Sequence, residues 1–217
     1  MIRRLLGLLF PPKCVLCGKL LTKEQTDLCP TCRLEAPVWQ KRGQKLRFIA
    51  DHTAVWYYEG HVRSSILRYK FRRAAGYCHC YGRMLAMRVL QELPEDIGLV
   101  TWVPISTRRL RKRGYDQSRL LAQAVAQELQ LPLEHCLVKK KHNQTQSEIR
   151  TPEARRANVL GAYEVCSQIP LAGKKILLVD DVITTGATAG ECARMLLMSG
   201  AKEVYCAAVA AGRNHKH

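Results

Sequence analysis

The sequence is poor in acidic residues, in aromatic residues and in long apolar runs. Only 18 Asp and Glu stand against 35 Lys and Arg, which gives a formal net charge of +17, and aromatic residues make up 6% of the chain. No segment reaches the ~20 consecutive apolar residues that a membrane-spanning helix needs. A hydrophobic share of 47% excludes a wholly disordered chain. The positive charge indicates an acidic partner, such as a nucleic acid, a phosphate or an anionic membrane surface.

The N-terminal segment MIRRLLGLLFPP has only part of the pattern of a secretory signal. Two arginines precede an apolar run, but the run from Leu5 to Phe10 is shorter than a signal core and no small-residue cleavage site follows. Pro11 and Pro12 end any helix that begins there. We therefore expect a short amphipathic helix in a cytoplasmic protein whose thiols are reduced.

Four of the ten cysteines have the spacing of metal knuckles. Cys14 and Cys17 form one C-x2-C pair, and Cys29 and Cys32 form a second after eleven intervening residues. Four thiolates close a tetrahedral site, which suits structural Zn²⁺ and leaves no open coordination position. Two disulfides or a thioredoxin-like redox pair are the alternatives, and the reduced environment favours zinc. The other six are expected to be buried thiols: Cys78, Cys80, Cys136, Cys166, Cys192 and Cys206.

Apolar runs alternate with helical patterns from residue 99 to residue 211. The expected strands are 99–105, 133–141, 176–180 and 204–211, and the expected helices are 117–129 and 187–199. Strand, helix and strand in this order predict a doubly wound α/β fold with a parallel sheet. We place the boundary of this domain after residue 45, so that residues 1–45 form a zinc module and residues 46–217 the α/β domain.

The segment from Ile176 to Thr188 carries the most specific pattern. An apolar strand ends in two carboxylates, Asp180 and Asp181, at the sheet edge where open α/β proteins bind ligands. A loop of threonines and one glycine leads directly into a helix, so that backbone N–H groups and hydroxyls can bind a phosphate. The segment matches neither a Walker A loop nor a dinucleotide fingerprint. A sugar phosphate satisfies both halves of the pattern, and the alternative is a tight structural turn capped by Asp181.

This segment resembles the phosphoribosyl-pyrophosphate (PRPP) motif of type I phosphoribosyltransferases. The resemblance implies that Asp180 and Asp181 hold the ribose hydroxyls and that the following loop binds the 5′-phosphate. The loop residues are Thr184, Thr185, Gly186, Ala187 and Thr188. It also implies Mg²⁺ bound together with PRPP.

Two further polar segments are candidates for the same site. The first follows a strand and is expected to bind pyrophosphate through a basic loop, unless it is a solvated charge run. Its residues are Ser106, Thr107, Arg108, Arg109 and Arg113. The second, 146–159, is expected to form a mobile lid or a surface helix. The lid and secondary residues are Gln117, Gln146, Arg155 and Asn158.

Basic and aromatic residues also gather between positions 58 and 73. Cationic grooves with stacking rings bind single-stranded nucleic acids. The cations of this tentative nucleic-acid surface are Arg63, Arg68, Lys70, Arg72 and Arg73. The alternative is a helix that buries Ile66 and Leu67 and leaves solvated cations outside.

Together these segments resemble the ComF/GntX family of competence and DNA-utilisation proteins, in which a four-cysteine zinc module precedes a type I phosphoribosyltransferase domain. The resemblance covers nearly the whole chain. It rests on the cysteine knuckles, residues 67–71, Val103-Pro104, residues 113–117, the stretch from Gln146 to Asn158 and the PRPP motif. The family usually has Phe and Asn where this chain has Tyr115 and Asp116.

The resemblance implies a phosphoribosyltransferase-like protein that binds PRPP or a ribose 5-phosphate ligand, with structural zinc and Mg²⁺. It further implies a role in DNA uptake or utilisation, beside a helicase and a membrane channel. Enzymatic pentosyl transfer is the favoured interpretation, although the sequence has no recognisable pocket for an acceptor. The alternative is a competence factor that keeps the fold and binds single-stranded DNA without turnover.

Overall fold

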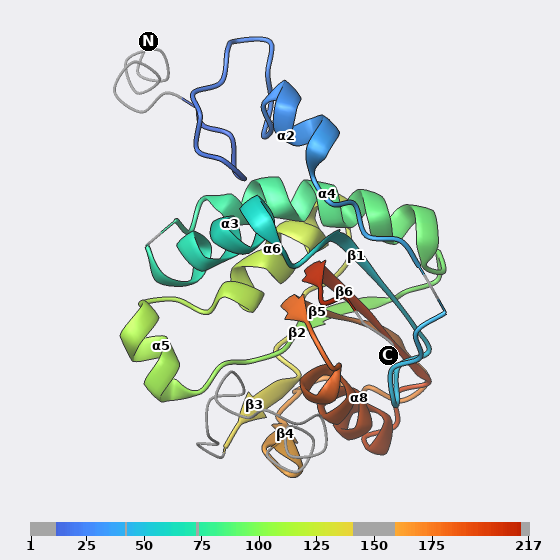
Figure 1. The fold of residues 1–217 in the computed structure, drawn as a ribbon. Helices are drawn as coiled ribbons and strands as arrows, with labels where there is room; N and C mark the ends of the chain where they lie inside the picture. Colours follow the sequence, from blue (N-terminus) through green and yellow to red (C-terminus); the bar gives the residue numbers. More distant parts are fainter. Residues whose placement is uncertain (1–11, 42, 73, 141–158, 214–217) are drawn as a thin grey trace.

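A computed structural model describes residues 12–41, 43–72, 74–140 and 159–213. Its centre is a four-stranded parallel sheet in the order β1-β6-β5-β2 (Figure 1). These strands are β1 (Asp51–Tyr57), β2 (Leu99–Trp102), β5 (Lys175–Ile183) and β6 (Glu203–Ala211). The predicted α/β fold with a parallel sheet is confirmed.

Helices cover both faces of this sheet (Figure 1). One face carries α3 (Gly60–Phe71), α4 (Tyr77–Glu92) and α6 (Gln117–Leu129), and the other carries α8 (Ala187–Met198). Side chains of β5 alternate between the two cores, as in any strand buried on both sides. Leu177 and Val179 pack with α3, α4 and α6, whereas Ile176 and Leu178 pack with α8. By this alternation, Asp181 lies on the same face of the sheet as Leu177 and Val179.

The strand expected over 133–141 is present only in part, and it does not belong to the central sheet. A single parallel bridge joins Leu133 to Val100 at the edge of the sheet. The hydroxyl of Thr101 then donates to the carbonyl of Glu134 at 2.9 Å, in place of a backbone donor. The chain turns away and forms β3 (Leu137–Lys139), which pairs antiparallel with β4 (Tyr163–Val165) in a separate two-stranded sheet near α8 (Figure 1).

The cysteine-bearing segment, which includes α2 (Pro30–Glu35), packs against the α/β body. Val15 and Leu16 belong to the same apolar core as α3 and α4. Arg68 of α3 donates to the carbonyl of Val15 at 3.1 Å and to that of Leu16 at 2.5 Å. Helix α3 is thus bonded directly to the first knuckle, and the boundary after residue 45 stays a prediction.

Several predicted features lie outside the described residues. They are the N-terminal amphipathic helix, the cation Arg73 and the lid residues Gln146, Arg155 and Asn158. Within the described ranges, no helix combines the length and the apolar character needed to cross a bilayer. All ten cysteines are free thiols; of the six outside the knuckles, five are buried as predicted and Cys166 is half-buried.

Candidate functional site

Two adjacent carboxylates stand near the C-terminal end of β5, and each has its own partner. Asp180 accepts a hydrogen bond from the Ser118 hydroxyl of α6 at 3.0 Å and another from the backbone N–H of Asp181 at 2.8 Å. Asp181 forms an ion pair with Lys70 of α3, with 2.7 Å between Nζ and Oδ1. The acid pair is therefore held from two helices on the same face of the sheet.

Burial controls the charge of Asp180. Burial, and after it the negative charge of Asp181, raise the pKa of Asp180 to about 7, against the opposing charge of Lys70. Asp180 therefore becomes ionised only near neutral pH. A cation or a hydroxyl donor placed against this carboxylate favours its ionised form.

The threonine–glycine loop follows the acid pair and leads into α8. Gly186 is the N-cap of α8 and has a φ of 72°, a left-handed conformation that glycine adopts without strain. Helices α5 and α6 begin at side-chain caps, Ser106 and Asp116, whereas the N-cap of α8 supplies none. The Ala187 N–H donates to the Thr185 hydroxyl at the long distance of 3.4 Å. The start of α8 is thus a helix N-terminus with a glycine N-cap, a type of backbone that can bind anions.

A small hollow lies at this loop, lined by Asp180 and residues 182–189. The segment that supports the loop was not predicted from the sequence. A Cβ placed on Gly186 would lie 2.6 Å from Leu46 Cδ2, and one on Gly190 would lie 3.0 Å from the carbonyl oxygen of Arg47. Residues 46–47 therefore pack closely against the loop and the first turns of α8.

The expected basic loop is a helix, α5 (Thr107–Arg113). The Ser106 hydroxyl accepts a hydrogen bond from the backbone N–H of Arg109 at 3.4 Å, and Gly114, with a φ of 82°, ends the helix. Arg, Leu and Lys are good helix formers, and Ser and Gly are ordinary start and stop signals, so the prediction of an irregular loop is wrong. In Figure 1, α5 lies away from the sheet.

One arginine of α5, Arg113, interacts electrostatically with the acid pair. Arg109 and Arg113 are half-buried, whereas Thr107 and Arg108 are exposed. Burial lowers the pKa of Arg113, and the charge of Asp181 opposes that change. Burial, and then the charge of Arg109, lower the pKa of Lys139 in β3, which the sequence did not mark as a candidate. Lys70 of α3, Arg113 of α5 and Lys139 of β3 therefore each interact electrostatically with one of the two carboxylates.

Gln117, predicted as a secondary site residue, is fully buried at the start of α6. Its side chain accepts a hydrogen bond from Arg113 at 2.7 Å, and its backbone carbonyl accepts one from the Tyr69 hydroxyl at 2.8 Å. The Tyr115 hydroxyl donates in turn to the carbonyl of Tyr69. These bonds join α3 to the start of α6, and one of them depends on the tyrosine that replaces the usual phenylalanine.

The cations of the tentative nucleic-acid surface have different surroundings. Arg63 and Arg72 are exposed, whereas Arg68 and Lys70 make the internal contacts described above. Ile66 and Tyr69 are fully buried on the inner face of the same helix. Two of the five cations therefore bind groups of the protein itself, and the surface stays a prediction.

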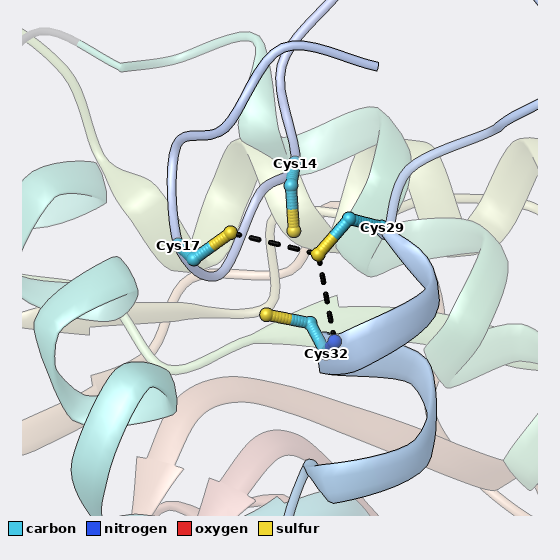
Figure 2. A group of neighbouring side chains, drawn as sticks. All are labelled: Cys14, Cys17, Cys29 and Cys32. Atoms are coloured by element: carbon cyan, nitrogen blue, oxygen red, sulfur yellow. Dashed lines mark hydrogen bonds between the residues drawn. The ribbon is translucent and has the colours of Figure 1, made fainter. Parts of the chain in front are cut away.

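The four knuckle cysteines converge on one point (Figure 2). Their sulfurs all lie within 4.8 Å of one another, and those of Cys17 and Cys29 are 3.7 Å apart. Tetrahedral zinc with bonds of about 2.3 Å places its sulfur ligands about 3.8 Å apart. Burial and the neighbouring thiols raise the pKa of Cys32. The donor set and spacing therefore fit zinc, whose charge allows all four thiols to ionise together.

Comparison with known proteins agrees with both parts of the molecule. A double zinc ribbon domain matches residues 5–43, and a phosphoribosyl transferase domain matches residues 116–217. The fold, the cysteine centre and the loop define a phosphoribosyltransferase-like α/β protein with an N-terminal zinc ribbon.

Individual relatives narrow this class of protein further. The DNA utilization protein YhgH of Escherichia coli (strain K12) is 28% identical over 216 residues, covering 89% of this chain and 88% of that one. Competence protein F of Haemophilus influenzae is 29% identical over 202 residues, covering 89% and 82%. Competence protein ComFC of Bacillus subtilis is 27% identical over 208 residues, covering 91% and 83%. The chain is thus similar over most of its length to proteins named for competence and DNA utilisation, and the resemblance to the ComF family seen in the sequence is confirmed.

Proposed function

We propose that the acid pair and the threonine–glycine loop bind PRPP together with Mg²⁺. The observation that carries this proposal is a small hollow lined by Asp180 and the loop that starts α8, with a second carboxylate, Asp181, next to Asp180 in the chain. Carboxylates accept hydrogen bonds from sugar hydroxyls, and the helix start binds a terminal phosphate. A sugar phosphate uses both the carboxylates and the helix start. The nearby cations suit a second group on the same ligand that carries more negative charge.

The same groups support transfer of the phosphoribosyl group. In such a transfer the bond from C1 of the ribose to the pyrophosphate oxygen breaks, pyrophosphate leaves with the electron pair, and an acceptor atom bonds to C1. Asp180 and Asp181 orient the ribose, while Arg109 and Arg113 stabilise the charge that grows on the leaving group. Mg²⁺, held by carboxylate and phosphate oxygens, supplies further charge neutralisation when it is bound.

A role in DNA uptake or utilisation is proposed from the relatives, whose names are "DNA utilization protein" and "Competence protein". In this role the protein works in the cytoplasm, next to the helicase and channel that handle incoming DNA. Direct binding of single strands by α3 has less support, because Arg68 and Lys70 are held internally. Strong binding of single-stranded DNA that falls steeply with salt would favour that alternative.

Calorimetric titration with PRPP and Mg²⁺ tests the proposal. The wild-type protein is expected to bind, and Asp181→Asn to bind about 10- to 100-fold more weakly, because a charged hydrogen-bond acceptor is lost. Asp96→Asn is the matched control, since this exposed carboxylate pairs with Lys175 at the opposite, N-terminal end of β5. Pyrophosphate release with candidate bases then tests turnover. Absence of PRPP binding by the wild-type protein would contradict the proposal.

A further inference from the structure

We propose that Lys70 is a further ligand-binding residue of this site, which binds the pyrophosphate group and so distinguishes PRPP from ribose 5-phosphate. This inference rests on the proposed function. It assigns Lys70 to a ligand-binding role that differs from the nucleic-acid contact predicted for it from the sequence.

The first argument is the state of the Lys70 ammonium. Its side chain is 17% exposed and that of Asp181 is 11% exposed. An ammonium has three N–H donors, and within the described part of the chain Asp181 is its one recorded partner. A largely desolvated cation is stabilised by each additional anionic acceptor. Lys70 can therefore keep its bond to Asp181 and offer the remaining donors to a ligand.

The second argument is that the backbone around Lys70 is fixed from two sides. Arg68 is bonded to the carbonyls of Val15 and Leu16 in the cysteine segment. The Tyr69 hydroxyl is bonded to the carbonyl of Gln117 in α6. The residues immediately before Lys70 are thus anchored to two separate parts of the molecule. A cation held in this way loses little conformational freedom when a ligand binds.

The third argument is the chemistry of the sugar. In the proposed site Asp180 and Asp181 receive the hydroxyls of C2 and C3, and the loop at the start of α8 receives the 5′-phosphate. In PRPP the pyrophosphate on C1 lies on the same face of the ring as the C2 and C3 hydroxyls, opposite the 5′ carbon, so a cation bonded to a carboxylate that receives either hydroxyl lies on the pyrophosphate side of the sugar. Arg113, which also interacts with the charge of Asp181, lies near the same end. Ribose 5-phosphate has no charged group there.

Calorimetric titrations of the full chain with PRPP and with ribose 5-phosphate, both with Mg²⁺, test this inference. Lys70→Met is expected to weaken PRPP binding at least about 10-fold and ribose 5-phosphate binding less than about threefold. Lys70→Arg keeps the charge and should restore most of the PRPP affinity. Arg63→Gln removes an exposed cation from the same helix and should change neither affinity.

The outcomes separate this inference from the proposed function. Equal losses for the two ligands, or none for PRPP, would contradict the assignment of Lys70 and leave the proposed function intact. No binding of either ligand by the wild-type protein would contradict both. If Lys70→Met fails to fold because Asp181 is left unpaired, Lys70→Gln replaces it, since the amide keeps a donor for Asp181 without the charge. Lys70→Gln is then expected to give the same selective loss.

Discussion

The cysteine centre and the acid-pair site are built in opposite ways. The cysteine centre takes all four sulfurs from residues 14–32, and it is closed by ligands of one kind. The acid-pair site combines β5 and the loop before α8 with side chains from α3, α5, α6 and β3. A structural metal centre is thus specified by local spacing, whereas a ligand site depends on how distant segments pack.

Helix α3 connects these two regions. Arg68 bonds to carbonyls of the first cysteine knuckle, and Lys70, two residues later, pairs with Asp181. Disturbing the cysteine centre should therefore affect the position of Lys70, whereas disturbing the acid pair should leave the cysteine centre intact. The predictions below test this asymmetry.

Loss of the zinc centre should give the largest effect. Cys32→Ala is expected to abolish stoichiometric zinc and to lower the free energy of unfolding by at least about 3 kcal/mol, because metal binding contributes directly to folding. Val15 and Leu16 share a core with α3, so the loss should extend beyond the ribbon. Metal analysis and thermal unfolding check this, with Cys166→Ser as the control. A Cys32→Ala protein that keeps its zinc and its stability would refute the assignment.

The two glycines Gly186 and Gly173 allow a smaller, matched test at the loop. Their φ values are 72° and 71°, but a Cβ on Gly173 meets nothing within 4 Å whereas one on Gly186 meets Leu46. Each alanine variant should cost about 1–2 kcal/mol of stability from backbone strain. Gly186→Ala should in addition weaken PRPP binding about 10-fold, because Leu46 and the loop must shift. Equal PRPP affinities for the two variants would argue against a phosphate site at this loop.

The pH dependence should give the smallest effect. Because the pKa of Asp180 is raised to about 7, the folded protein binds more protons than the unfolded chain between about pH 4 and pH 7, and stability falls as pH rises through that range. Ligand binding favours the ionised carboxylate, whose fraction rises about tenfold from pH 6 to pH 8, so the affinity for PRPP with Mg²⁺ should rise by up to about tenfold over that range. Asp180→Asn should remove most of both slopes. Identical slopes in wild type and variant would exclude Asp180 as their source.

Much of the fold follows from the sequence, because buried parallel strands and capped helices have strong local signals. The runs at 176–180 and 204–211 and the helix at 117–129 were found on that basis, as were the four ligands of the cysteine centre. Prediction from the sequence failed where a tertiary contact determines the path of the chain. After the bridge at Leu133, the carbonyl of Glu134 accepts a hydrogen bond from the Thr101 hydroxyl, and the chain leaves the edge of the central sheet and pairs with β4.

The residues of the candidate site also differ in whether a local sequence pattern or only tertiary packing reveals them. The acid pair and its loop form one contiguous segment and were predicted as such. Lys70 was noticed only as one basic residue among several, and Ser118, Lys139 and Leu46 carried no pattern that pointed to the site. These residues lie roughly 40 to 130 positions from Asp180 in sequence, and only the tertiary fold brings them to the acid pair and its loop.

A crystal structure of the protein with PRPP and Mg²⁺ tests the central claim most directly. We predict the 5′-phosphate at the backbone N–H groups of residues 185–188, the ribose hydroxyls against Asp180 and Asp181, and the pyrophosphate beside Lys70. PRPP bound at another place, or its absence from this hollow at concentrations that saturate the protein, would contradict the account.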